Sequence, residues 1–524
     1  MTLSASRPVA ASNRFGKTPG RRKPRYGRCC VTTGLFIAGL LVVFKNSLIK
    51  KDVVMFFLEP LLTDGIAQLS YLVGDTSTGH AAVIDPRTDV EVYETLARKH
   101  GVSITHIFET HIHADFVSGS RSLAERIGTA KICVSGVRAD YKFEGEPIKD
   151  GQEFDFGSFR LTARHTPGHT PEHMSFELRE SKHAEMPWAV FSGDSLFVGS
   201  AGRPDLLGEA ETEGLAKDLY KTLYDYYLKL DDYVTIYPGH GAGSACGADI
   251  GDRMLSTIGY ERRTNKFLRF PGFDAFRAFV VDDAPPAPWH YPMLKKVNAA
   301  GPEIMDRLPT IPALPPSEFR KVAREPGVTI IDTRSMLAFG GGHVPGAINI
   351  GARPEMSAWV GQMFDLDQRL LLVVDNDDDV ESVQRLIVRT GHSQFAGYLA
   401  GGMKAWEVSG LPLQKLEQIS VEEVHQDQSN GSHLNLVDVR SPGEWESGHL
   451  PGAEHHFIGD MRERIMGLDK SKRYATYCAS GYRASIASSL MQSRGFQQVA
   501  NIPGSYGAWT AAGYEVEHDK GSQS

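Results

Sequence analysis

The stretch THIHADFVSG, residues 110–119, places two histidines and one aspartate within five positions. Imidazole nitrogens and carboxylate oxygens are the ligands that zinc and iron take in proteins. On a loop that follows a strand, His111 and His113 can both face one cation. His111, His113 and Asp115 therefore predict one part of a metal site, which residues from elsewhere in the chain must complete.

Three further motifs supply those residues, because His169 lies in HTPGHTPEH, Asp194 ends the segment SGD and His240 ends the segment PGH. Each follows an apolar run that is typical of a β-strand. Loops carried by a rigid sheet would gather such side chains at one place. The nearby His106, His165 and His173 exceed the coordination positions of one metal, so we interpret them either as supports of the ligands or as merely structural residues.

These motifs, in this order, resemble those of the metallo-β-lactamase superfamily over about residues 55–280. In that superfamily a run HxHxDH serves two adjacent metals, and its final histidine belongs to the second metal. Phe116 stands at that position and cannot act as a ligand. A second site would keep only Asp115, His240 and a shared Asp194, so we expect a single metal.

Within the superfamily the chain looks most like the persulfide dioxygenases, also called sulfur dioxygenases. The resemblance implies one Fe(II) per chain on His111, His169 and Asp194. It leaves His113, Asp115 and His240 either to support these ligands or to form a secondary metal position. Two histidines and one carboxylate leave open positions that suit Fe(II) binding a thiolate and O₂ together, with zinc as the alternative metal.

The segment GSAGRPDL, residues 199–206, adds to this resemblance. The family carries a GRxD segment whose arginine faces the substrate, which implies that Arg203 binds an anionic group of the persulfide. The alternative is a structural arginine paired with Asp205.

The segment TYCASGYRAS, residues 476–485, follows a strand-like run and opens an apolar helical stretch. A cysteine at that junction faces loop N–H groups and the positive end of a helix, which both favour a thiolate. Arg483 adds a fixed cation beside Cys478. Four residues separate the two, so the loop is tighter than a phosphatase loop and suits a terminal sulfur atom.

An internal repeat surrounds this cysteine, because VTIIDTRSMLAFGGGHVPGA (328–347) matches LNLVDVRSPGEWESGHLPGA (434–453). The second copy resembles a single-domain rhodanese, which implies that Cys478 carries a persulfide whose charge Arg483 and the loop amides stabilise. The first copy has VVDNDDDVES (373–382) at the corresponding loop, with no cysteine and four aspartates. We predict that it is catalytically inactive and serves as a spacer, a dimer contact or a docking surface.

The elements that must position these residues are strands alternating with helices, so the fold class is α/β. We predict a metallo-β-lactamase αββα sandwich followed by two rhodanese-like α/β domains, each with a central parallel sheet. The predicted boundaries are a basic, partly apolar N-terminal extension (1–54), the metal domain (55–283), a proline-rich linker (284–311), the inactive rhodanese copy (312–415) and the active copy (417–520).

Composition limits the partners and the compartment. Residues 1–51 hold eleven Lys and Arg and no acid, so the remaining chain is strongly acidic, which argues against nucleic-acid binding. Five scattered cysteines favour a reducing, cytoplasmic location. Arg21–Arg28 before the apolar run Val31–Phe44 could target or anchor the protein, or belong to no folded structure. We also expect a homo-oligomer.

These motifs and the resemblance to persulfide dioxygenases together imply an iron enzyme. It would oxidise glutathione persulfide, or a similar small persulfide, with O₂ and water to sulfite and the free thiol. Cys478 would then move sulfane sulfur to or from thiosulfate. A zinc-dependent thioester hydrolase of the glyoxalase II kind is the first alternative, and Phe116 counts against it. A non-catalytic sulfur carrier or sensor with a structural metal is the second.

Overall fold

The computed structural model describes residues 56–282, 287–431 and 434–518. The predicted N-terminal extension lies outside the described residues. Within the described ranges, no helix is long and apolar enough to cross a membrane.

The metal domain contains two six-stranded sheets. The first has the order β1-β2-β3-β4-β5-β6, with these bounds: β1 (Phe56–Thr63), β2 (Gln68–Asp75), β3 (His80–Ile84), β4 (Ser103–Phe108), β5 (Lys131–Ser135) and β6 (Glu146–Ile148). The second has the order β12-β11-β10-β9-β8-β7, with these bounds: β7 (Glu153–Asp155), β8 (Phe159–His165), β9 (Met174–Glu180), β10 (Pro187–Gly193), β11 (Thr235–Pro238) and β12 (Ser256–Thr257).

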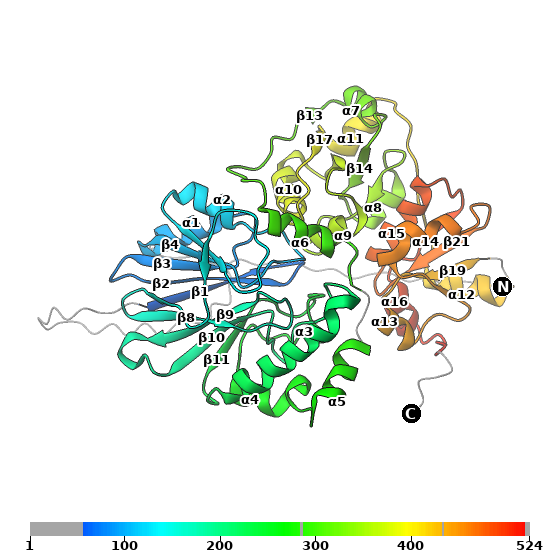
Figure 1. Ribbon diagram of the computed structural model, residues 1–524. Coiled ribbons are helices and arrows are strands. Elements are labelled where there is room, and N and C mark those ends of the chain that lie inside the picture. Colours follow the sequence, from blue (N-terminus) through cyan, green and yellow to red (C-terminus); the bar gives the residue numbers. More distant parts are fainter. Residues whose placement is uncertain (1–55, 283–286, 432–433, 519–524) are drawn as a thin grey trace, which may run out of the picture. The chain divides into compact units, whose positions relative to one another are not determined.

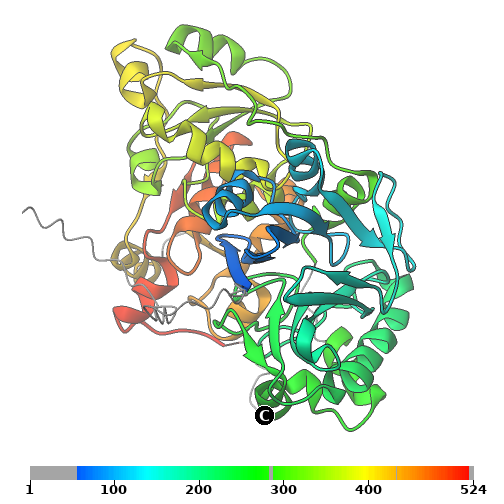
Figure 2. The same ribbon diagram turned by 90° about the vertical axis from the view of Figure 1, so that its left-hand side faces the viewer.

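The two sheets pack face to face on an aromatic core, in which the rings of Tyr71 and Phe191 lie 5.0 Å apart. Helices cover the outer faces (Figure 1), and the view in Figure 2 shows the same layers from the side. Those on the first sheet are α1 (Glu91–His100) and α2 (Ser120–Ile127); those on the second are α3 (Glu209–Lys221), α4 (Ile258–Thr264) and α5 (Phe273–Arg277). This arrangement is the predicted αββα sandwich.

The region between the metal domain and the first rhodanese copy differs from the predicted proline-rich linker. Residues Tyr291–Ala300 form helix α6. Pro292 lies in the first turn, where the missing N–H costs no helical hydrogen bond, so it does not prevent the helix. The helix becomes part of the metal site, as described below.

The two rhodanese copies have the same sheet topology, which confirms the predicted parallel α/β domains. The sheet orders are β13-β17-β16-β14-β15 and β18-β22-β21-β19-β20, and every pair of neighbouring strands is parallel. Strands of the first copy are β13 (Ala313–Leu314), β14 (Val328–Asp332), β15 (Ile348–Asn349), β16 (Arg369–Val373) and β17 (Phe395–Leu399). Strands of the second are β18 (Glu417–Gln418), β19 (Asn435–Asp438), β20 (Glu454–His455), β21 (Tyr474–Tyr477) and β22 (Val499–Asn501).

Helices flank both sheets (Figure 1). Those of the first copy are α7 (Pro316–Val322), α8 (Met336–Gly341), α9 (Met356–Met363), α10 (Val380–Val388) and α11 (Gly402–Val408). Those of the second are α12 (Val421–Ser429), α13 (Pro442–Glu446), α14 (Met461–Arg464), α15 (Tyr482–Ser493) and α16 (Ser505–Ala511).

The two copies pack on each other, since one apolar core cluster takes residues from both. Buried polar contacts fix this packing: Ser485 Oγ donates to Asn349 Oδ1 at 2.6 Å, and Asn349 N–H donates to Ser489 Oγ at 2.9 Å. Both serines belong to α15, the helix that follows Cys478. The first copy therefore supports the helix that begins at the loop of the second.

Candidate metal centre and sulfur-transfer loop

The three predicted metal ligands meet at one point between the ends of strands from both sheets. His111 follows β4, His169 follows β8 and Asp194 follows β10 directly. Their ligand atoms all lie within 4.8 Å of one another, and all three residues are buried. Asp194 Oδ2 is 3.8 Å from His111 Nε2 and 3.6 Å from His169 Nε2.

The chemistry of these groups fits a metal cation. His111 Nε2 is buried and has no hydrogen-bond partner among the described residues. Burial, followed by the neighbouring histidines, holds the pKa of His111 well below its usual value, so the ring is neutral and offers a lone pair. Burial alone would raise the pKa of Asp194, but His240 and His169 lower it, so the carboxylate is ionised.

The other ring nitrogen of each histidine ligand is fixed by a hydrogen bond. His169 Nδ1 donates to the carbonyl of Arg203 at 3.0 Å, and His111 Nδ1 lies 2.9 Å from Thr110 Oγ1. Such partners set the tautomer and hold the ring plane. Both Nε2 atoms are thus directed toward Asp194.

His240 lies between the carboxylates of Asp194 and Asp115. Its Nδ1 lies 2.8 Å from Asp194 Oδ1, and its Nε2 lies 2.7 Å from Asp115 Oδ2. Burial would lower the pKa of His240, but Asp194 and Asp115 raise it to about 10, so the ring carries a proton on each nitrogen. Cys246 completes a second cluster with Asp115 and His240.

His113 lies beside the ligands but bonds away from them. Its ring centre is 4.2 Å from that of His111, and its Nε2 lies 3.1 Å from Asp85 Oδ1 and 3.2 Å from Glu109 Oε2. The ring of the buried Phe116 lies 4.5 Å from it. As expected, His113 is near the site without being one of the three converging ligands.

Asp85 and Glu109 are functional residues that the sequence interpretation missed. Asp85 directly follows β3, has a positive φ of 51° and accepts hydrogen bonds from the N–H and the hydroxyl of Thr110, at 2.7 and 2.8 Å. These bonds fix the residue before His111. In the sequence Asp85 only ends the apolar run AAVID, which does not show that its carboxylate contacts Thr110.

Asn298 of α6 was missed as well, because the region was interpreted as a linker. Its side chain donates to the carbonyls of His113 and Phe116, at 2.8 and 2.7 Å, and accepts from Ser118 N–H at 2.9 Å. One buried amide therefore holds three backbone groups of the metal loop.

The first rhodanese copy also holds the metal loop. Val117 N–H donates to the carbonyl of Arg389 at 2.8 Å. Arg389 and Arg385 of that copy form ion pairs with Asp89 and Glu91 of the metal domain, at 3.5 and 3.3 Å. The loop that carries His111 is thus held by hydrogen bonds from α6 and from the first rhodanese copy.

Arg203 is buried and forms a two-pronged ion pair with Asp205, at 2.9 and 2.6 Å. The ion pair with Asp205 is therefore present, and the Arg203 carbonyl also fixes His169. Binding of a substrate anion by Arg203 stays a prediction of the sequence. His173 is structural too, because its Nε2 accepts from Asp194 N–H at 3.0 Å and burial lowers its pKa to about 3. His165 lies 2.9 Å from the carbonyl of Pro171 and does not approach the three ligands.

The sulfur-transfer loop lies between β21 and α15. Cys478 is 1% exposed, and its Sγ accepts a hydrogen bond from Gly481 N–H at 3.1 Å. Gly481 has a φ of +104°, which turns its N–H inward and favours glycine. Cys478 N–H donates to Ser505 Oγ at 3.1 Å. The predicted contact between loop amides and sulfur is therefore present.

Arg483 lies in the first turn of α15 and bonds to Glu444 through two hydrogen bonds of 2.7 Å. Burial alone would lower the pKa of Arg483, but Glu444 and the nearby Cys478 raise it. Glu444 itself is held by a capping box with Ser441 at the start of α13. The cation predicted beside Cys478 is thus positioned by a carboxylate that the sequence interpretation did not identify.

The corresponding loop of the first copy has different chemistry. Asp332 pairs with Val373 in the sheet as Asp438 pairs with Tyr477, so Val374 stands where Cys478 stands in the second copy. Val374 is fully buried. The following aspartates form a short helical turn, Asp377–Asp379, capped by Asn376.

Comparison with known proteins agrees with this architecture. Residues 63–240 match the metallo-beta-lactamase superfamily, and residues 315–409 and 420–512 match the rhodanese-like domain. Over 203 residues the chain is 32% identical to persulfide dioxygenase ETHE1, mitochondrial, of Homo sapiens, which takes in 38% of this chain and 70% of the relative. The chain belongs to the metallo-β-lactamase superfamily and carries two rhodanese-like domains after its metal domain.

Hydrolases match the metal domain equally well. The cytoplasmic hydroxyacylglutathione hydrolase of Arabidopsis thaliana is 33% identical over 185 residues, which take in 35% of this chain and 66% of the relative. Among solved structures, a metallo-beta-lactamase from Staphylococcus aureus is 34% identical and has a TM-score of 0.59, covering 66% of this chain and 98% of that chain. The protein is therefore an enzyme of this superfamily with a metal-binding set of residues, and its substrate must be inferred.

Proposed function

We propose that the metal domain oxidises a small persulfide to sulfite with Fe(II), and that the second rhodanese copy transfers sulfane sulfur to or from thiosulfate. The observation that carries the proposal is the joint presence of two sulfur-compatible sites in one chain. One is the buried set His111, His169 and Asp194, and the other is the Cys478 loop. The likeness to a persulfide dioxygenase supports the substrate class.

The overall reaction takes a persulfide RSSH, O₂ and water to RSH and sulfurous acid, with all atoms accounted for. His111, His169 and Asp194 would hold the metal by two nitrogens and one oxygen. When bound, Fe(II) supplies the electron-transfer chemistry that lets ground-state O₂ react with a thiolate-type sulfur. The ligands are almost fully buried, which keeps bulk water from the reacting groups.

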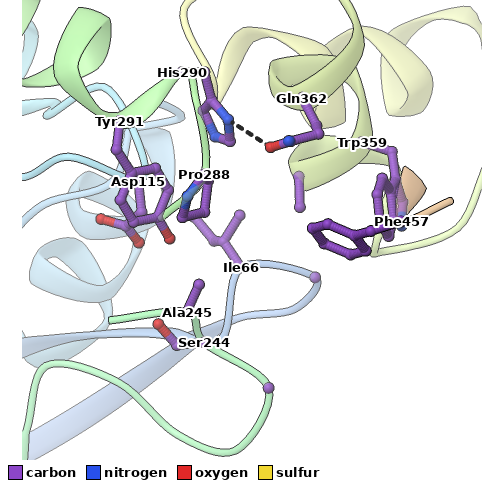
Figure 3. A pocket seen from close by; sticks show the side chains of 13 residues that line it. Ile66, Asp115, Ser244, Ala245, Pro288, His290, Tyr291, Trp359, Gln362 and Phe457 are labelled. Atoms are coloured by element: carbon purple, nitrogen blue, oxygen red, sulfur yellow. Dashed lines mark hydrogen bonds between the residues drawn. The ribbon is translucent and has the colours of Figure 1, made fainter. Parts of the chain in front are cut away.

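The protein's own groups would manage the protons. Asp115 Oδ1 has no hydrogen-bond partner among the described residues, and Asp115 lines a cavity (Figure 3). It is therefore placed to accept the S–H proton of an entering persulfide. The protonated His240 binds Asp115 Oδ2 and Asp194 Oδ1, which keeps both carboxylates oriented and balances their charge.

In the second copy, the Cys478 thiolate would attack the outer sulfur of a small persulfide RSSH. The S–S bond of RSSH breaks, the thiolate RS⁻ leaves, and Cys478 then carries the sulfane sulfur as a persulfide that sulfite can attack. In the direction of synthesis, the Cys478 persulfide gives its outer sulfur to sulfite, the S–S bond breaks, and thiosulfate and the Cys478 thiolate result. Gly481 N–H donates to the sulfur, and Arg483 supplies the fixed positive charge for the anions. Since sulfite is the product of the metal domain, the two sites would share an intermediate.

Zinc-dependent thioester hydrolysis is the second candidate, because hydroxyacylglutathione hydrolases are similarly close relatives. Phe116 counts against it, since this residue cannot be a ligand and stands where the two-metal run HxHxDH has its final histidine. The cytoplasmic location, the homo-oligomer and the predicted domain boundaries remain predictions of the sequence.

Metal analysis and substrate tests distinguish the candidates. Wild-type protein purified without oxygen should contain about one iron per chain, and the variant Asp194→Ala should bind no iron. The wild type should consume O₂ when a persulfide is added and should not cleave the thioester S-lactoylglutathione. A zinc-loaded protein that hydrolyses the thioester and ignores persulfides would contradict the proposal. Asp155→Asn is the control, because it removes an exposed carboxylate of the same domain that is not one of the three converging ligands.

A further inference from the structure

A cavity of about 200 Å³ lies beside Asp115 where four parts of the chain meet. The metal domain contributes Ile66 and Asp115, and the segment before α6 contributes Pro288 and His290. The first rhodanese copy contributes Trp359 from α9, and the second contributes Phe457. Figure 3 shows these side chains around one space.

The cavity touches the metal site through Asp115. That carboxylate binds His240, which in turn binds the ligand Asp194, at 2.7 and 2.8 Å. The unpartnered oxygen of Asp115 is buried. A molecule in the cavity would therefore have one end within reach of the groups that surround the metal.

The wall formed by the first rhodanese copy is fixed in place. Gln362 Oε1 lies 3.0 Å from His290 Nδ1, and Gln362 Nε2 donates to the carbonyl of Gly459 at 3.0 Å. Its backbone carbonyl accepts from Trp289 Nε1. One residue of α9 thus joins the segment before α6 to the second rhodanese copy.

A second contact closes the other side of the cavity. Gly65, in the turn between β1 and β2, approaches the backbone of the first copy so closely that a Cβ would lie 1.8 Å from the carbonyl oxygen of Pro354. No other residue fits that turn without moving one of the two domains. The turn at Gly65 and the first rhodanese copy are therefore in direct contact at the cavity wall.

The lining is apolar or uncharged apart from Asp115. Ile66, Pro288, Tyr291, Trp359 and Phe457 provide hydrocarbon and aromatic surface. Burial lowers the pKa of His290 to about 4, so this ring is neutral at pH 7. No lysine or arginine is among the described residues that line the space.

We propose that this cavity binds the thiol arm of the persulfide substrate, and that the cysteine-less rhodanese copy, through Trp359, supplies a wall that selects an uncharged arm. The inference rests on the proposed function, because it assigns the substrate class of the same metal site. A thiol arm that carries carboxylates would lose their hydration in this cavity, and no lysine or arginine of the lining would pair with them. An alkyl or amide arm would instead bury apolar surface against the lining. The copy that cannot transfer sulfur is thereby part of the oxidising site.

Binding of the free thiols tests the inference without turnover. In saturation-transfer NMR on the full chain, the uncharged N-acetylcysteamine should bind more tightly than glutathione. Trp359→Ala should weaken N-acetylcysteamine at least about tenfold, because it removes the aromatic wall. The control Val408→Ala changes a side chain of the same copy that is 80% exposed and does not line the cavity, so it should have no effect.

Turnover supplies the complementary test. The ratio of kcat/KM for N-acetylcysteamine persulfide over glutathione persulfide should exceed one, and Ser244→Lys should lower it about tenfold by adding a cation to the wall. Unchanged binding in Trp359→Ala, or a ratio that favours glutathione persulfide in the wild type, would overturn the inference. Thiol binding without O₂ uptake from any persulfide would instead overturn the proposed function.

Discussion

The two rhodanese copies share one framework and differ at one loop. In each, an Asp–Arg pair two residues apart lies at the end of β14 or β19, with the arginine Nη2 2.6 Å from the aspartate Oδ2 in both: Asp332 with Arg334, and Asp438 with Arg440. In each, the same arginine also donates to a glycine carbonyl eight residues on. The framework has thus been kept where the cysteine is missing.

The two copies differ directly after the neighbouring strands β16 and β21. Cys478 meets an inward N–H and a cation, whereas Val374 is an apolar core residue followed by a capped turn of aspartates. The first copy also contacts the metal domain through Arg389 and the segment before α6 through Gln362. The same fold therefore presents a cysteine loop in one copy and a supporting surface in the other.

The largest expected effect tests this division directly. Cys478→Ser should lower thiosulfate:cyanide sulfur transfer at least about a thousandfold, because the serine hydroxyl cannot carry a sulfane sulfur. O₂ uptake with a persulfide should stay at the wild-type level. Substantial residual transfer would mean that the first copy is active after all.

The shared framework predicts a matched pair of stability effects. Asp438→Asn and Asp332→Asn should each destabilise their own copy by about 3–5 kcal/mol, since each leaves a buried arginine without its partner. Hydrogen exchange followed by mass spectrometry would locate the loss. Only Asp438→Asn should also reduce sulfur transfer, and equal losses of transfer in both variants would break the comparison.

A smaller effect follows from the carboxylate that positions Arg483. Glu444→Gln should slow sulfur transfer about tenfold, because it loosens the cation beside Cys478. Burial would raise the pKa of Glu444, but Arg483 and Ser441 lower it to about 2. Its contribution to stability is present above pH 4.5 and is lost as the pH falls toward 2, so thermal melting of wild type and variant should converge in acid. A constant difference down to pH 2 would contradict this assignment.

The last variant should leave sulfur transfer unchanged. Val374→Cys restores a cysteine at the matching position of the first copy, but no glycine N–H or arginine stands in the aspartate-rich turn that follows. In a Cys478→Ser background it should give no measurable sulfur transfer. Transfer above background would show that the cysteine alone decides activity.

Much of the site could be predicted because its residues carry the signal themselves. His111, His169 and Asp194 follow strands in a characteristic order, and Cys478 precedes a helix in a repeated pattern. The supporting residues have no such signature: Asp85 and Asn298 act through hydrogen bonds to backbone groups that only folding brings near. The contact of Gly65 with Pro354 is of the same kind, because each residue belongs to an ordinary turn in its own domain.

The central claim is that one chain oxidises persulfide sulfur and then transfers sulfane sulfur to the product. The most direct test follows O₂, sulfite and thiosulfate together after a persulfide is added to anaerobically purified, iron-containing protein. We predict rapid O₂ uptake in both the wild type and Cys478→Ser, with thiosulfate formed by the wild type and only sulfite by the variant. No O₂ uptake by iron-loaded wild type with uncharged or charged persulfides would contradict the account.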